Sequence, residues 1–100
     1  MKDLPIVCSL TEPELRARRE EISRVLITHV REKRELETGW GFRFEANDAV
    51  IDELLRLIQL ERKCCPFLQF NLVLEANAGP VWLEITGDQA KDFLKMELGL

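Results

Sequence analysis

Three cysteines are the residues of this sequence best suited to chemistry: Cys64 and Cys65 are adjacent, and Cys8 stands alone near the start. Three thiolates that converge on one point suit soft ions such as trivalent arsenic or antimony, mercury, or monovalent copper. A structural zinc site prefers four ligands with a spacer inside each cysteine pair, so this pattern does not favour zinc. A disulfide between neighbouring residues is strained and easily reduced. The pattern therefore predicts a thiophilic metal or metalloid ion as the ligand.

Two other interpretations of the cysteines stay open on the sequence alone. Cysteine is often a small buried hydrophobe, and the pair would then serve only core packing. A single activated thiol would instead make a thiol-redox protein. His29, the only histidine, lies on the apolar stripe of its predicted helix and is expected at the edge of the core, with a role as a fourth ligand as the sharper alternative. Glu61 is expected to pair with a neighbouring base on the surface, although it could also orient a cation.

The elements that must position these thiols begin with a predicted strand over residues 5–10, which places Cys8 on its inward face. A capping box at residues 11–14 starts a helix that the apolar spacing extends to about residue 32. Residues 31–37 are expected to form a charged connection to the next strand. If the strand with Cys8 lies in the sheet near the end of the second helix, its thiol can reach the other two.

The second predicted strand is marked by Trp40, Phe42 and Phe44, which alternate with small or charged residues. The glycines between them indicate a bulge or a place where another group approaches closely. A second helix, capped at residue 47 or 48, is apolar over more than half of its circumference and ends at residue 64 or 65, because Pro66 excludes helix at the residue before it. This helix puts both adjacent cysteines at its buried end.

The last third of the chain predicts strands over residues 67–75 and 81–86, joined by a hairpin turn, and a helix over residues 89–98. The inward residues of the first of these strands are expected to include Phe70, Leu72 and Leu74. The order is β-α-β-α-β-β-α, which predicts an α+β two-layer sandwich with a mostly antiparallel four-stranded sheet and the helices on one face. The other face is either solvated or the surface of a homodimer, because Trp82 and Val73 point to it.

Composition predicts one domain over residues 1–100, since half of this length could not bury its own core. The net charge of −4 argues against nucleic acid as a partner. No apolar run reaches the ~18 residues of a membrane span, and residues 1–5 lack the apolar stretch of a signal peptide, so we expect no membrane partner and a cytoplasmic protein with reduced thiols. Neither a phosphate-binding glycine loop nor a catalytic triad is recognisable, so an enzyme is the less favoured class.

The segment LERKCCPFLQFNL (residues 60–72), followed by GPVWL (residues 79–83) and ITG (residues 85–87), resembles a small family of uncharacterised bacterial α+β proteins with an Glu-Arg-x-Cys-Cys-Pro-Phe-x-x-Phe signature. Its vicinal cysteines also resemble a segment of some mercury-resistance-type regulators. The resemblance implies soft-metal or metalloid handling at Cys64 and Cys65, with Cys8 as a weaker third position. The chain departs from the family at residues 88–89, where Asp-Gln replaces Pro-Glu, which touches a helix cap and no thiol.

Overall fold

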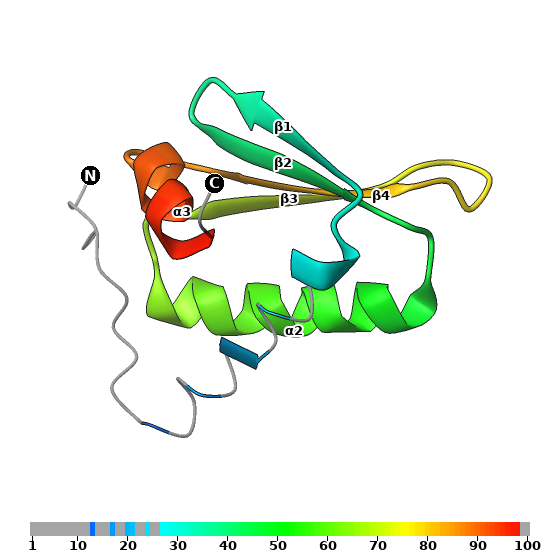
Figure 1. Ribbon diagram of the computed structural model, residues 1–100, viewed down its shortest axis with the longest axis horizontal. Coiled ribbons are helices and arrows are strands. Elements are labelled where there is room, and N and C mark those ends of the chain that lie inside the picture. The colour runs from blue at the N-terminus through cyan, green and yellow to red at the C-terminus, as the bar shows by residue number, and fades with distance from the viewer. Residues whose placement is uncertain (1–12, 14–16, 18–19, 22–23, 25–26, 99–100) are drawn as a thin grey trace.

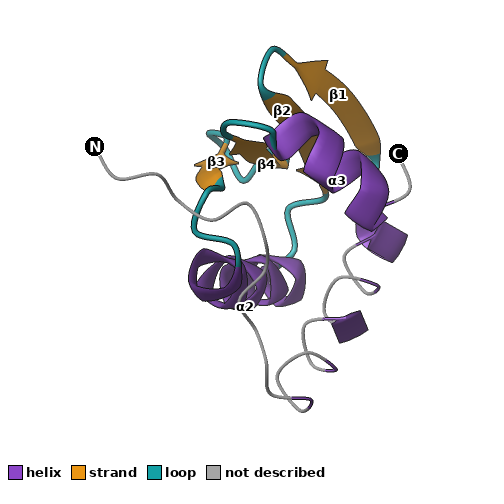
Figure 2. Ribbon diagram, turned by 90° about the vertical axis from the view of Figure 1, so that its left-hand side faces the viewer, coloured by secondary structure: helices purple, strands orange, loops and turns teal. Residues whose placement is uncertain are grey.

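Four strands form one antiparallel sheet in the computed structural model, which describes residues 13, 17, 20, 21, 24 and 27–98 (Figure 1). The strand order is β1-β2-β4-β3. Helices α2 and α3 lie on the same side of the sheet (Figure 2), which confirms the predicted α+β class with two layers. The elements are β1 Glu32–Leu36, β2 Gly39–Phe44, α2 Asp48–Cys64, β3 Gln69–Leu74, β4 Val81–Thr86 and α3 Ala90–Leu98.

The hydrophobic core lies between the inner face of the sheet and the two helices. Phe42 of β2 pairs with Leu83 of β4, so both side chains point to the same face. They are buried together with Ile85, because alternate residues of the two central strands point inward. Leu54 of α2 and Leu94 of α3 belong to the same buried cluster. Removal of these side chains from water is the main force that holds the helices on the sheet.

Helix α2 begins and ends where the sequence predicts. Asn47 is the N-cap, and its Oδ1 accepts hydrogen bonds from the backbone amides of residues 49 and 50 at 2.9 and 3.4 Å. Cys64 is the last helical residue and Cys65 is the C-cap, directly before Pro66. No helix in the described part of the chain, α2 included, is long and apolar enough to cross a membrane.

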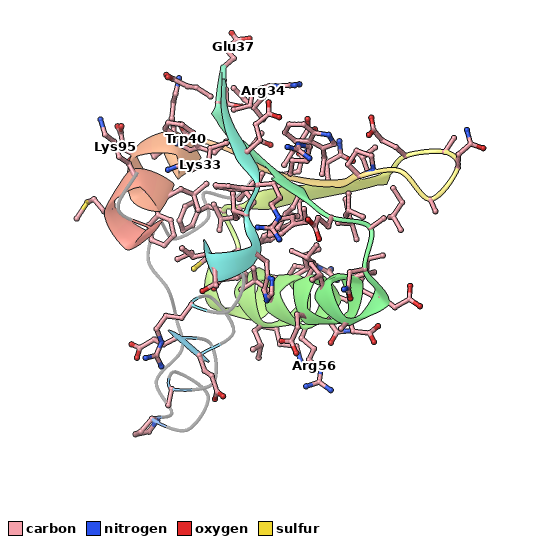
Figure 3. All side chains as sticks on the ribbon, turned by 45° about the vertical axis from the view of Figure 1, so that its right-hand side comes forward. Lys33, Arg34, Glu37, Trp40, Arg56 and Lys95 are labelled. Carbon is pink, nitrogen blue, oxygen red and sulfur yellow. The ribbon has the colours of Figure 1, made fainter. Side chains whose placement is uncertain are left out.

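Helix α3 is docked on β1 and β2 by polar contacts as well as by its apolar face. The indole Nε1 of Trp40 donates a hydrogen bond to the backbone carbonyl of Lys91 at 3.2 Å, and Figure 3 shows Trp40 beside this helix. The Nζ of Lys91 lies 2.7 Å from Oε2 of Glu35 in β1. The hydrogen bond and the positive charge of Lys91 lower the pKa of Glu35 below the usual glutamate value.

Strand β1 corrects the prediction that residues 31–37 form only a charged connection. Its side chains show no apolar alternation, so the sequence carries no recognisable strand pattern there. The strand is held instead by its ladder with β2, which runs from Glu32 opposite Arg43 to Leu36 opposite Gly39. Nε of Arg43 also donates a hydrogen bond to Oε1 of Glu32 at 3.1 Å. Strand β1 therefore forms because its backbone pairs with β2, and its own residue types did not predict it.

The helix before β1 is confirmed at the described positions between 13 and 29, all of which are helical. It ends at His29, earlier than the predicted residue 32, because the chain turns there toward β1. The predicted strand over residues 5–10 lies outside the described residues. Leu74 of β3, which was expected to face the core, is instead exposed, and so is Leu55 on the broad apolar surface of α2. Leu74 lies on β3, the last strand of the sheet within the described residues.

The outer face of the sheet carries Trp82 and Val73, as predicted, and these two residues lie opposite each other on β4 and β3. The guanidinium carbon of Arg34 lies 4.4 Å from the centroid of a Trp82 ring, a cation–π contact. Nδ2 of Asn71 donates a hydrogen bond to Oε1 of Glu84 at 2.8 Å on the same face. The outer face is therefore mostly polar, with a tryptophan that a neighbouring arginine partly covers.

Candidate functional site

The carboxyl end of α2 holds the adjacent cysteines in a turn that backbone hydrogen bonds define. The amide of Cys65 donates to the carbonyl of Glu61 at 2.7 Å, and the amide of Leu68 donates to the carbonyl of Cys65 at 3.1 Å. The chain reverses over Pro66 and Phe67 before it enters β3. Because α2 and β3 are both part of the sheet-and-helix core, this short turn fixes the backbone of the cysteine pair.

Two neighbours clamp this turn. The ring of Phe67 is buried and packs edge-on against Phe93 of α3, with ring centroids 5.0 Å apart. The carbonyl oxygen of Phe67 also lies so close to Gly87 that a Cβ at residue 87 would overlap it. Gly87 has a φ of +135°, a backbone conformation that residues with side chains rarely adopt. Sequence reasoning missed this clamp, although the glycine directly after β4 was a signal for it.

Cys65 is wholly buried, with 0% of its surface exposed, and belongs to the hydrophobic core. Its side chain therefore contributes to packing, whatever else it does. A bulky reagent can reach this sulfur only when the structure opens locally.

Glu61 corrects the prediction of a position on the surface, because only 6% of its surface is exposed. It follows Leu54 and Leu57 in the row of α2 that faces the sheet, one turn before Cys65. Glu61 has an interaction partner, and every fully buried side-chain nitrogen or oxygen in the described residues is hydrogen-bonded. The signal for its burial was the spacing of three and four residues from those leucines.

The structure does not describe the side chains of the other two predicted ligands, Cys64 and Cys8. Cys64 is the last residue of α2, but its side chain is outside the described part of the structure, and Cys8 lies outside the described residues altogether. Within the residues that are described, no three His, Cys, Asp or Glu side chains gather as metal ligands. The convergence of three sulfur atoms therefore stays a prediction.

Two exposed cations directly precede the cysteines in the sequence. Arg62 and Lys63 lie in the last turn of α2 and are exposed, where they also stabilise the negative end of the helix dipole. His29 was expected at the edge of the core, and this prediction is wrong because the residue is exposed at the end of its helix. The next residue, Val30, packs against the core in its place.

No family model, curated protein or solved structure matches this chain. Its chemistry must therefore be inferred from the residues at the end of α2. They form a rigid turn with two adjacent cysteines, a buried carboxyl group one turn earlier, and two exposed cations. Such a set can supply thiolate ligands to a soft ion.

Proposed function

We propose that this protein binds a soft, thiophilic metal or metalloid ion through Cys64 and Cys65, with Cys8 as a third ligand, and does not turn over a substrate. The observation that supports this best is a turn, fixed by backbone hydrogen bonds, that holds the adjacent cysteines directly after the last turn of α2, where Glu61 is buried. A leucine would fill the position of Glu61 at lower cost, because a carboxyl group loses its hydration on burial. Core packing alone therefore does not explain why a glutamate stands at residue 61.

The binding chemistry follows from the softness of sulfur. In arsenic trihydroxide, each thiol replaces one hydroxide, and its proton leaves with that hydroxide as water, so each As–S bond formed releases one water and no electron is transferred. Two adjacent cysteines would form the first two bonds and Cys8 the third.

A second candidate function is a structural or interaction domain in which the cysteines only fill space. The complete burial of Cys65 favours this candidate, because a thiol inside the core can act as a small apolar side chain. The same burial disfavours Cys65 as the nucleophile of a redox protein, since such thiols are partly exposed.

Thiol counting separates these functions. The thiols of the native protein are counted with a small thiol reagent, with and without arsenite, and again after unfolding, where all three must react. We expect arsenite to protect two or three thiols and native mass spectrometry to show one arsenic per chain. Cys64→Ser should remove the protection, whereas Cys8→Ser should leave a weaker site with two thiols. Ser9→Ala, beside Cys8, is the matched control and should bind like the parent protein.

Two results would overturn the metal proposal. Thiols that react only after unfolding, with no effect of arsenite or mercury, would establish the packing function. A single thiol that reacts rapidly at neutral pH would establish the redox function.

The same proposal includes the setting in which the protein works. Reduced thiols are maintained in the cytoplasm, which suits an ion-binding site made of free sulfur atoms. The net charge of −4 makes a small ion a better ligand than nucleic acid.

A further inference from the structure

The two edges of the sheet are built differently. Strand β1 carries charged residues at four of its five positions, and such charges on an edge strand discourage pairing with another chain. Strand β3 has no charged residue and no proline among its six residues. It pairs with β4 in unbroken register from Gln69 to Leu74. Among the described residues, the sheet therefore ends at β3 in a regular, uncharged strand that lacks the protection given to β1.

Exposed apolar side chains lie along the β3 side of the molecule. Leu74 is 56% exposed, Val73 38%, and Leu55 of α2, the helix below β3 and β4 in Figure 2, is 44% exposed. Leu55 shares a helix row with Ile51 and Ile58, about 100° around the helix from the row that faces the sheet. In Figure 1, α2 runs from right to left beneath the sheet. Because the helix is right-handed, this direction turns the row of Ile51, Leu55 and Ile58 toward the β3 side of the sheet, which is the left side in Figure 2.

The charges of α2 differ between its two ends. The exposed or half-buried charged residues near its amino end, Asp48, Asp52 and Glu53, are acidic, those of its last turn, Arg62 and Lys63, are basic, and Arg56 is the middle residue of the helix. Arg56 points away from the sheet (Figure 3). Leu55 lies close to the middle of the helix. Two such helices attract each other when they lie antiparallel and repel each other when they lie parallel.

We propose that this protein forms a homodimer in which β3 pairs antiparallel with β3 of a second copy. The two-fold axis is perpendicular to the sheet, which joins the two four-stranded sheets into one and keeps the helices of both copies on one side. The same axis places the two α2 helices side by side and antiparallel. The acidic amino end of each then faces the basic last turn of the other, with Leu55 near the axis.

A second copy fits this edge better than a foreign strand, because the charge order of α2 is complementary to itself in the arrangement that β3 pairing imposes. The pairing also covers Val73 on the outer face and Leu74 on the inner face in one step. Trp82 is the weaker anchor, since Arg34 already covers its ring.

Sedimentation equilibrium of the full chain over a wide concentration range tests the dimer. We expect a reversible dimer, and we expect Leu74→Lys and Leu55→Lys each to raise its dissociation constant about tenfold or more, because the two-fold axis introduces every added charge twice. Met96→Lys makes the same replacement at a side chain of α3 that is 86% exposed, and should leave the dissociation constant unchanged. Circular dichroism verifies that each variant is folded, and Asn71→Lys, on the exposed edge, replaces any variant that is not.

Three outcomes would overturn the proposal. The parent chain could be a monomer at all concentrations, or a dimer that both edge variants leave intact. A dimer that Trp82→Ala abolishes while Leu74→Lys does not would move the interface to the outer face. None of these outcomes depends on whether the cysteines bind an ion.

Discussion

Replacing Gly39 by alanine should strongly destabilise the protein, whereas the same replacement at Gly41 should not. Both glycines lie on the outer face of β2, two residues apart. A Cβ at Gly39 would overlap the carbonyl oxygen of Ile85 and would lie 2.8 Å from the Cα of Thr86, well inside the ~3.5 Å of van der Waals contact. A Cβ at Gly41 would lie 3.7 Å or more from the side chain of Trp82, which is ordinary contact.

The magnitude follows from what has to move. The atoms that obstruct a methyl group at Gly39 belong to the backbone of β4, so the two central strands must separate locally. Overpacking of this kind costs about 1–3 kcal/mol, and each ladder hydrogen bond that is lost adds about 1 kcal/mol. A loss of about 3 kcal/mol is a large share of the roughly 5–10 kcal/mol expected for a domain of this size. For Gly41→Ala we expect a change within about 1 kcal/mol, favourable in sign because alanine restricts the unfolded chain.

Urea unfolding followed by tryptophan fluorescence measures both changes. With a slope of about 1.5 kcal/mol per molar urea, Gly39→Ala should lower the midpoint by about 2 M, while Gly41→Ala should leave it within about 0.7 M of the parent. Equal midpoints for the two variants would refute the reasoning, because they would mean that β2 and β4 do not approach each other most closely at Gly39.

Three more predictions concern the docking of α3 and the core. Lys91→Ala should raise the pKa of Glu35 toward the usual glutamate value, as measured by NMR titration of the carboxyl carbon, and an unchanged pKa would contradict the contact. The stabilisation that this ion pair gives the parent protein is present above the ordinary glutamate pKa and is lost as the pH falls through the lowered pKa of Glu35. Trp40→Phe should cost about 1 kcal/mol in urea unfolding through loss of the indole hydrogen bond to the Lys91 carbonyl, and no loss would mean that the bond is not formed. Leu54→Ala, at a wholly buried position, should cost about 2–5 kcal/mol in calorimetric unfolding, whereas Met96→Ala should change the stability by less than about 0.5 kcal/mol; similar costs would place Leu54 outside the core.

Sequence reasoning succeeded where a local signal decides the structure. The amide side chain of Asn47 and the ring of Pro66 act on the backbone beside them, so the limits of α2 could be predicted without knowledge of the rest of the chain. The alternation of large apolar residues identified β2, β3 and β4 for a similar reason. The position of the adjacent cysteines at the end of a helix could be predicted in the same way.

The partners of each element could not be predicted from local signals. Strand β1 has charged side chains on both faces and exists because β2 lies beside it, and Glu61 is buried because its helix row faces the sheet. Leu55 and Leu74 have the same apolar character as the core leucines, yet both are exposed, and Leu74 lies on the strand that ends the sheet within the described residues.

Sequence alone thus determined the limits of α2 and the presence of β2, β3 and β4, since capping, proline geometry and side-chain alternation act over a few residues. Only the tertiary structure decided which strand lies at the edge, which acid is buried and which apolar surface stays open. The physical reason is that burial depends on contacts between segments far apart in the chain, and no short stretch of sequence records its distant neighbours.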